Sequence, residues 1–145
     1  MTTFPLVSEM IDLTGKRALV TGGGKGIGAA ISRRLVEAGA SVTIADIDPD
    51  MSEVANELSA TFALCDITVP EQLEAAVRLA SNESNLDILV NNAGIYPPTG
   101  PIAEVSDEFV SKMLDINVRA QFSASREAAN CMSSGGSIVN ISSIA

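Results

Sequence analysis

Short apolar runs alternate with amphipathic stretches along most of the chain. Five runs are typical of strands buried on both faces of a sheet: 16–21, 41–46, 60–65, 86–90 and 137–142. Helical periodicity separates consecutive runs over four stretches: from the glycines after 21 to about 38, about 50–58, 68–80 and about 106–132. Since every crossover is long enough to hold a helix, the pattern predicts an α/β fold with a doubly wound parallel sheet.

The length of the chain fits a single domain. It has 145 residues, and residues 1–15 show no clear period, so we expect an N-terminal arm followed by one nucleotide-binding domain over 16–145. We find no internal repeat, low-complexity tract or linker in the sequence.

A cluster of glycines joins the first predicted strand to the first predicted helix. Residues 18–28 read Ala-Leu-Val-Thr-Gly-Gly-Gly-Lys-Gly-Ile-Gly. Glycine leaves no β-carbon in the way of a ligand, so peptide N–H groups and the positive end of the helix dipole can meet a pyrophosphate. The alternative is an ordinary turn. A nucleoside triphosphate P-loop is excluded, because Gly26 stands where Ser or Thr should bind magnesium and Leu19 replaces the leading glycine.

Polar residues follow each predicted strand at its carboxyl end, the edge where open parallel sheets bind ligands. These are Thr21 with the glycines, Asp46, Asp66, Asn91 with Asn92, and Ser142 with Ser143. Asp46 stands eighteen residues after Gly28, close to where a mononucleotide-binding fold places the acidic residue that accepts hydrogen bonds from the adenosine ribose. Its alternative role is that of a plain turn or N-cap residue.

Composition narrows the possible partners. With 9 basic and 18 acidic residues the net charge is −9, which argues against nucleic acid and anionic membrane surfaces. There is no histidine, and Cys65 and Cys131 are far apart, so neither a zinc site nor a disulfide framework is predicted. The N-terminus lacks a basic signal region and no apolar stretch reaches about 18 residues, from which we expect a cytoplasmic protein.

Four motifs in this order resemble the short-chain dehydrogenase/reductase family, and the match runs from Lys16 onward. The cofactor motif is Thr21 to Gly28, the Asn-Asn-Ala-Gly motif is Asn91 to Gly94, the helix asparagine is Asn117, and the strand serine ends the run Gly136 to Ser143. The resemblance implies a Rossmann fold of which these residues supply the first five strands.

The resemblance also implies which residues contact a nicotinamide dinucleotide. It assigns the pyrophosphate end to the glycine-rich turn: Gly22, Gly24, Lys25, Gly26, Ile27 and Gly28. It assigns the adenine to the pair after the third strand, Asp66 and Ile67. The remaining contacts come from the asparagine motif: Asn92, Ala93 and Gly94. For Asn91, a structural role in tying strands together is as well supported as a functional role.

Charge at the ribose predicts NAD rather than NADP. The Asp46 carboxylate accepts hydrogen bonds from the ribose hydroxyls but repels a 2′-phosphate, and Ile47 offers no compensating cation. Lys25 argues the other way, since family members that use NADP often carry a basic residue in this turn; the alternative is a solvated lysine.

For chemistry, the resemblance implies hydride transfer between the nicotinamide and a small alcohol or ketone. Ser143 would donate a hydrogen bond to the substrate oxygen. Ser142 is the alternative for this role, and only one of the two can face the substrate, because adjacent strand residues point to opposite faces. Asn117 would interrupt its helix to hold a water in a proton relay, rather than being a solvated helix residue.

One part of the family pattern is not found in these residues. The tyrosine that acts as general acid and base, with its lysine one helical turn later, is expected beyond Ala145, and Tyr96 has Gly100 where that lysine would stand. We therefore expect the N-terminal half of an oxidoreductase that is inactive alone, with homo-oligomer formation through the helix at 106–132 if a longer chain exists. The alternative is a dinucleotide-binding module or pseudoenzyme without turnover.

Overall fold

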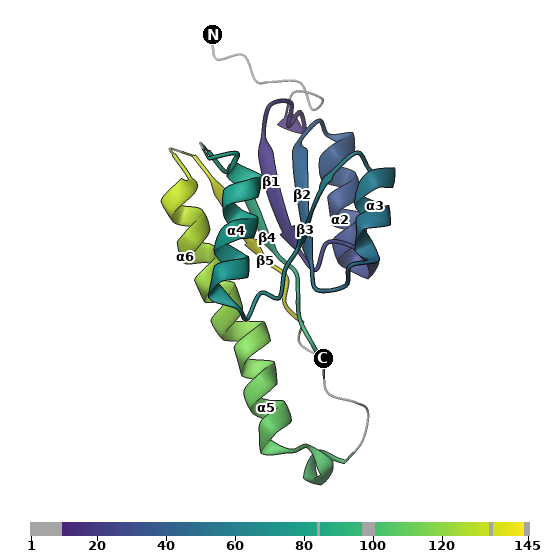
Figure 1. The fold of residues 1–145 in the computed structure, drawn as a ribbon, viewed down its shortest axis with the longest axis vertical. Coiled ribbons are helices and arrows are strands. Elements are labelled where there is room, and N and C mark those ends of the chain that lie inside the picture. Colours follow the sequence, from purple (N-terminus) through teal and green to yellow (C-terminus); the bar gives the residue numbers. More distant parts are fainter. Residues whose placement is uncertain (1–9, 84, 97–100, 134, 144–145) are drawn as a thin grey trace.

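The computed structural model describes residues 10–83, 85–96, 101–133 and 135–143, and contains one five-stranded sheet (Figure 1). Neighbouring strands pair in the order β3-β2-β1-β4-β5, and every pair is parallel, as predicted. The strands are β1 (Arg17–Thr21), β2 (Ser41–Asp46), β3 (Thr61–Leu64), β4 (Ile88–Asn91) and β5 (Ser137–Asn140). Strand order reverses between the paired strands β1 and β4, so the chain segments that leave these two strands lead to opposite faces of the sheet.

Helices cover both faces of the sheet, which makes it doubly wound. In Figure 1, α2 and α3 lie on one side of the strands and α4 and α6 on the other, while α5 extends past the carboxyl ends of the strands. The helical segments are α2 (Gly26–Glu37), α3 (Met51–Glu57), α4 (Pro70–Ser81), η1 (Ile102–Glu104), α5 (Asp107–Leu114), η2 (Asp115–Ala120) and α6 (Gln121–Cys131).

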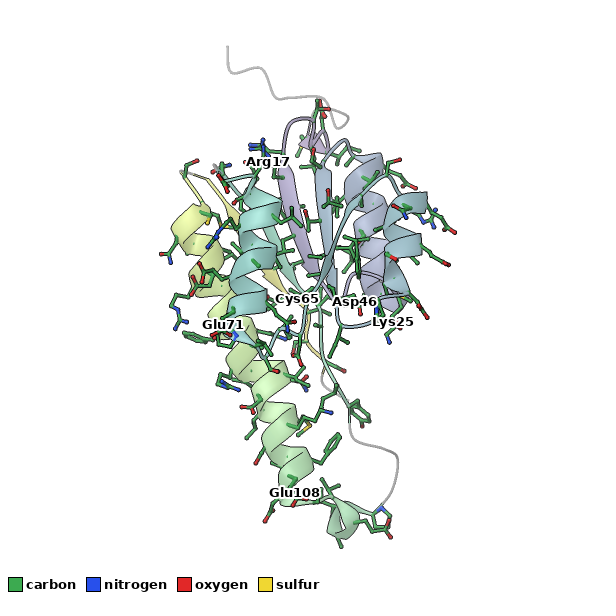
Figure 2. All side chains as sticks on the ribbon, in the orientation of Figure 1. Arg17, Lys25, Asp46, Cys65, Glu71 and Glu108 are labelled. Atoms are coloured by element: carbon green, nitrogen blue, oxygen red, sulfur yellow. The ribbon has the colours of Figure 1, made fainter. Side chains whose placement is uncertain are left out.

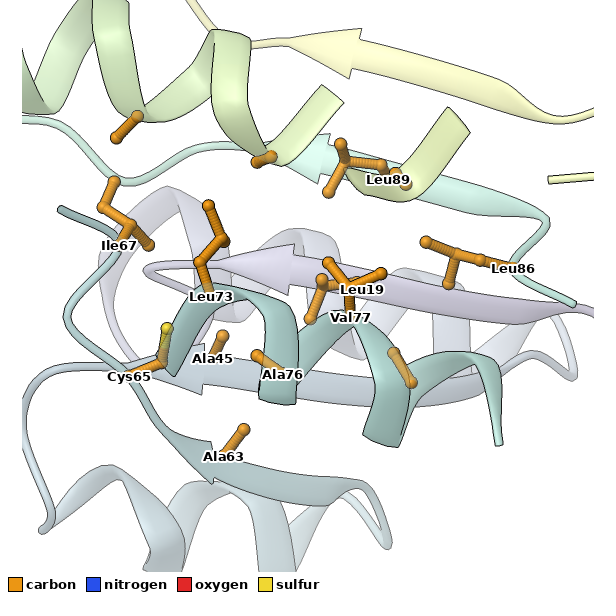
Figure 3. Close-up of a cluster of buried hydrophobic side chains, with 14 residues drawn as sticks. Leu19, Ala45, Ala63, Cys65, Ile67, Leu73, Ala76, Val77, Leu86 and Leu89 are labelled. Atoms are coloured by element: carbon orange, nitrogen blue, oxygen red, sulfur yellow. The ribbon is translucent and has the colours of Figure 1, made fainter. Parts of the chain in front are cut away.

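Two hydrophobic clusters hold these layers together. One joins α4 and α6 to the sheet around Leu19, Leu73 and Leu89, each at most 1% exposed (Figure 3). The other joins α2 and α3 to the opposite face around Val20 and Ile44, both fully buried. Burial of β1 and β2 on both faces explains why their sequences are continuously apolar instead of alternating.

Several predicted boundaries shift for local reasons. The helix predicted from Thr68 begins at Pro70, because Asp66 accepts hydrogen bonds from the N–H and the hydroxyl of Thr68 in a turn. The strand predicted to reach Ser142 ends at Asn140, although Ile141 still donates its N–H to the Asn91 carbonyl at 2.9 Å.

The long helix predicted over 106–132 forms, but it is not uniformly α-helical. Ser106 caps it by accepting a hydrogen bond from the N–H of Phe109 at 3.2 Å. Its middle, η2, is a π-helical segment, which adds a residue to the turn and changes the direction in which the following side chains point. Asn117 lies within this segment.

Part of the predicted N-terminal arm is attached to the domain. Residues 1–9 lie outside the described residues, but Leu13 donates its N–H to the Ala38 carbonyl at 2.7 Å and packs against the cluster around Ile44. Gly39, which follows the end of α2, has φ +95°, the left-handed conformation that favours glycine after a helix.

Asp87 ties the start of β4 to the start of β1. Its carboxylate accepts the N–H of Arg17 at 2.9 Å and the ammonium of Lys16 at 3.1 Å. The Arg17 N–H chiefly, helped by Lys16, holds the pKa of Asp87 below its ordinary value. A lowered pKa means that this stabilisation is complete above the unfolded-state pKa of about 3.9 and is lost as the pH falls through the lower folded-state value.

We expect Asp87→Asn to lower the free energy of unfolding by about 1 kcal/mol at pH 7, because the charge-assisted hydrogen bonds weaken while much of the Lys16 attraction is screened by solvent. Urea denaturation from pH 7 to pH 2.5 would show the gap between wild type and variant closing below about pH 4. Asp50→Asn at an exposed site is the charge-matched control. A gap that stays constant down to pH 2.5 would contradict this assignment.

Candidate functional site

A cleft of about 960 Å³ opens at the carboxyl ends of the strands, beside the point where the strand order reverses. Figure 2 shows Lys25, Asp46 and Cys65 close to this edge, with Glu108 further along α5. Every predicted cofactor residue except Gly24 and Gly26 lines the cleft: Gly22, Lys25, Ile27, Gly28, Asp46, Asp66, Ile67, Asn92, Ala93 and Gly94.

The glycine-rich turn is shaped by close approach of its own backbone. A β-carbon built on Gly28 would collide with the carbonyl oxygen of Gly22 and lie 2.5 Å from Nδ2 of Asn92. Gly26, at the start of α2, has φ +55° and no atom within 4 Å of where a β-carbon would be. The turn is therefore tight on the inside and open beside the helix N-terminus, an arrangement that suits an anionic ligand.

Asp46 acts as a turn residue and also lines the cleft, where its ribose role stays a prediction. Its side chain is only 4% exposed, yet it lines the cleft. Oδ1 accepts the N–H of Asp48 at 3.2 Å, as a turn residue does, and Oδ2 accepts the N–H of Gly24 at 3.1 Å. Gly24 thus lies behind the cleft, as a partner of Asp46.

Thr21 and Asn92 lock the turn after β1 to the turn after β4. Thr21 is 2% exposed, and its hydroxyl accepts the N–H groups of Asn92 and Ala93 at 3.1 and 3.2 Å. In return, Nδ2 of Asn92 donates to the carbonyls of Thr21 and Gly22 at 3.1 and 2.9 Å. These bonds hold the glycine-rich turn against the Asn-Ala-Gly segment, so the two segments form one wall of the cleft.

The segment after β3 lines the cleft, at the residues that the family resemblance assigns to adenine. The Asp66 side chain accepts the N–H of Thr68 at 2.9 Å. Ile67 belongs to the hydrophobic core and is only 9% exposed. Cys65 lines the cleft beside them, and burial, with the neighbouring Asp66 charge, raises the pKa of the Cys65 thiol to about 11. The thiol therefore stays protonated at neutral pH and behaves as a small apolar wall.

Asn117 lies next to the cleft but is not among the residues that line it. Its side-chain oxygen accepts the Ile95 N–H at 2.9 Å and its nitrogen donates to the Ile95 carbonyl at 2.8 Å. Asn117 is therefore not a solvated helix residue. Its side-chain amide fastens the segment after Gly94 to the π-helical turn.

Asn91 is a buried link between β4, α6 and β5. Its Nδ2 donates to the Asn140 side-chain oxygen at 2.8 Å and to the Ser125 hydroxyl at 3.0 Å. Its Oδ1 has no hydrogen-bond partner among the described residues. These contacts favour the structural role over a direct contact with a ligand.

Ser142 and Ser143 follow the end of β5 and are both exposed. Neither is among the residues that line the cleft. The structure brings the carboxyl end of β5 alongside that of β4 through the pairing of Asn140 with Asn91, so both serines extend beyond the same edge as the cleft.

Sequence reasoning missed one wall of the cleft, which comes from α5 and the start of η2. Its residues recur at intervals of three and four, the spacing of one helix face: Asp107, Glu108, Ser111, Lys112, Asp115 and Ile116. The periodicity was visible in the sequence, but a charged helix face is more typical of solvent exposure. With this wall, the charged residues that line the cleft are five acidic and two basic, Lys25 and Lys112.

Within the described ranges, no group of three or more His, Cys, Asp or Glu side chains is arranged to hold a metal ion. The same ranges contain no helix whose length and hydropathy would allow it to cross a membrane.

Comparisons with known proteins agree with the motifs. A family model described as short chain dehydrogenase matches residues 16–145. The chain is 41% identical over 140 residues to the 3-oxoacyl-[acyl-carrier-protein] reductase FabG of Rickettsia prowazekii, covering 93% of this chain and 56% of that protein. It is 39% identical over 134 residues to the L-fucose dehydrogenase of Bos taurus, covering 90% and 50%.

Solved structures share the fold. A short chain dehydrogenase from Burkholderia cenocepacia in complex with NADP superposes with a TM-score of 0.84 at 38% identity, covering 91% of this chain and 57% of that one. A dehydrogenase/reductase from Sinorhizobium meliloti gives a TM-score of 0.87 at 35% identity, covering 94% and 57%. The chain thus spans about half the length of the relatives it matches.

Proposed function

Because this chain belongs to the short-chain dehydrogenase/reductase family of oxidoreductases, we propose that its cleft binds NAD and contributes to hydride transfer on a small alcohol or ketone. The observation that carries the proposal is the single cleft wall made by the glycine-rich turn and the Asn92 to Gly94 segment, locked together by Thr21.

The residues present fit a dinucleotide. The turn at Gly22 to Gly28 has no room for side chains on its inner side and open space beside Gly26, where the positive end of the α2 dipole would meet a pyrophosphate. Asp66, whose backbone and side chain are held by Gln72 and Thr68, would accept a hydrogen bond from the adenine amino group. When bound, the nicotinamide supplies the hydride chemistry.

The proposed preference for NAD over NADP rests on charge. Asp46 lines the cleft with a carboxylate, and the next residue in the lining, Ile47, carries no compensating charge. A 2′-phosphate brought into this field would be repelled, whereas ribose hydroxyls would donate to the carboxylate. The Burkholderia cenocepacia structure holds NADP. A preference of this chain for NADP would depend on Lys25, the cation in the glycine-rich turn.

Our test of this function is the discrimination between the two cofactors. We expect Asp46→Ala to weaken NADH binding about tenfold, because a charge-assisted hydrogen bond to the ribose is lost, and to weaken NADPH binding much less. Fluorescence titration of both cofactors measures the ratio directly. Asp50→Asn, which removes a nearby exposed charge, should leave the ratio unchanged. An Asp46→Ala variant with wild-type selectivity would refute the ribose assignment.

At the substrate end, we propose that Ser143 donates a hydrogen bond to the substrate oxygen and that Asn117 supports proton transfer. A serine hydroxyl beyond the β5 edge suits an oxygen on which negative charge grows as a ketone is reduced. One N–H and one lone pair of the Asn117 side-chain amide are used by Ile95, so a water would bind the remaining ones or the backbone of the π-helical turn. Relatives named as a reductase and a dehydrogenase support the alcohol or ketone class of substrate.

We also propose that the protein works as a homo-oligomer in the cytoplasm. An exposed apolar stripe follows the long helix at intervals of four residues, from Val110 through Leu114 and Val118 to Phe122, which is 77% exposed. Such a stripe favours helix-to-helix association with a second copy. Light scattering that gives a monomer mass would contradict the proposed homo-oligomer.

The proposed location in the cytoplasm is supported by the two free cysteines, which fit a reducing compartment.

A further inference from the structure

Met51, the first residue of α3, closes over the glycine-rich turn from outside the cleft. A β-carbon built on Gly24 would collide with Cβ and Cγ of Met51 and lie 2.8 Å from its sulfur. The Met51 side chain therefore occupies the space that any side chain at position 24 would need. Neither hydrophobic cluster, as formed by the described residues, includes Met51.

The same glycine is bonded to the carboxylate at the ribose end of the cleft. The Gly24 N–H donates to Oδ2 of Asp46 at 3.1 Å, and Oδ1 of Asp46 accepts the N–H of Asp48 at 3.2 Å. The Asp48 carbonyl in turn accepts the N–H of Met51 at 3.1 Å. Contact between Met51 and Gly24 closes a ring of four residues, of which Asp46 is one.

We propose that Met51 is a positioning residue: by packing on Gly24 it holds the Gly24 N–H against Asp46 and so orients that carboxylate toward the ribose. The ribose part rests on the function proposed above. Two of the lone pairs on the Asp46 carboxylate accept backbone N–H groups, which leaves others for the two ribose hydroxyls. If Gly24 moves, the carboxylate loses the bond that sets its rotation.

The first test needs no cofactor. We expect Met51→Ala to speed hydrogen exchange of the Gly24 amide about fivefold, since a protecting hydrogen bond to a charged group is weakened. Met51→Leu, which keeps the bulk, should restore slow exchange. Unchanged exchange at Gly24 in Met51→Ala would overturn the positioning role, whether or not the protein binds a dinucleotide.

The second test asks whether the effect reaches the ribose. We expect Met51→Ala to raise the Kd for NADH about fivefold and the Kd for NADPH less, because the 2′-phosphate is not held by Asp46. An equal loss of affinity for NADH and NADPH would overturn the claim that Met51 orients Asp46 toward the ribose. Wild-type protein that binds neither would overturn the proposed function and this ribose part together, while Gly24 exchange still decides whether Met51 holds the turn.

A size swap provides the matched controls. Gly24→Ala should weaken NADH binding by collision with Met51, and adding Met51→Gly should recover part of the loss, since the double variant moves the bulk from one side of the contact to the other. Val54→Ala, on the same helix but packed against the core, should lower stability without changing the NADH to NADPH ratio. A double variant that binds no better than Gly24→Ala would contradict the contact.

Discussion

Gly28→Ala should lower the affinity for NADH about 100-fold, the largest loss that we expect from a single methyl group in this chain. A β-carbon at position 28 collides with the Gly22 carbonyl oxygen and lies 2.5 Å from Nδ2 of Asn92. Those two groups are joined by a 2.9 Å hydrogen bond across the floor of the turn. The added methyl has to separate them, so the open side of the turn no longer fits a pyrophosphate.

Isothermal titration with NADH measures the loss, and urea denaturation separates it from unfolding, for which overpacking predicts a cost of about 2 kcal/mol. Gly15→Ala is the control, because Gly15 has φ +80°, no atom within 4 Å of its added β-carbon, and a place before the start of β1, at the opposite end of the strand from the cleft. It should lose stability through backbone strain and keep its affinity. Wild-type affinity in Gly28→Ala would mean that the turn is not the pyrophosphate site.

Thr21→Val should lower the free energy of unfolding by about 3 kcal/mol, because the isosteric valine leaves two N–H groups without an acceptor. Thr21 is 2% exposed, and its hydroxyl accepts the N–H groups of Asn92 and Ala93. It also donates to the Val90 carbonyl at 3.4 Å, a longer and weaker bond. Since these bonds join the turns after β1 and β4, NADH binding should weaken in the same variant.

Urea denaturation of Thr21→Val and Thr21→Ser tests this role. Serine keeps the hydroxyl and loses only a methyl group, so it should cost about 1 kcal/mol and retain NADH binding. Equal destabilisation by valine and serine would show that packing of the methyl group, and not hydrogen bonding by the hydroxyl, is what position 21 contributes.

The strands and their parallel arrangement could be predicted because burial on both faces leaves a continuous apolar run, as in the fully buried Leu19 and Ile44. The motif residues could be located because the carboxyl ends of parallel strands meet at one edge. Element ends were less predictable. Asp66 accepts the N–H and the hydroxyl hydrogen of Thr68 in a turn, so the helix predicted from Thr68 begins at Pro70, a local competition that periodicity does not register.

The amino-acid sequence by itself determined the α/β class, the strand edge that carries the cleft and the acidic residue Asp46 that lines it. These follow from periodicity and from the spacing of Gly28 and Asp46, which are local properties of the chain. Only the tertiary structure decided that Asn117 binds Ile95, that one charged face of α5 lines the cleft, and that Met51 covers Gly24. Each of these depends on the distance between segments far apart in the sequence, and that distance is set by how the helices pack on the sheet.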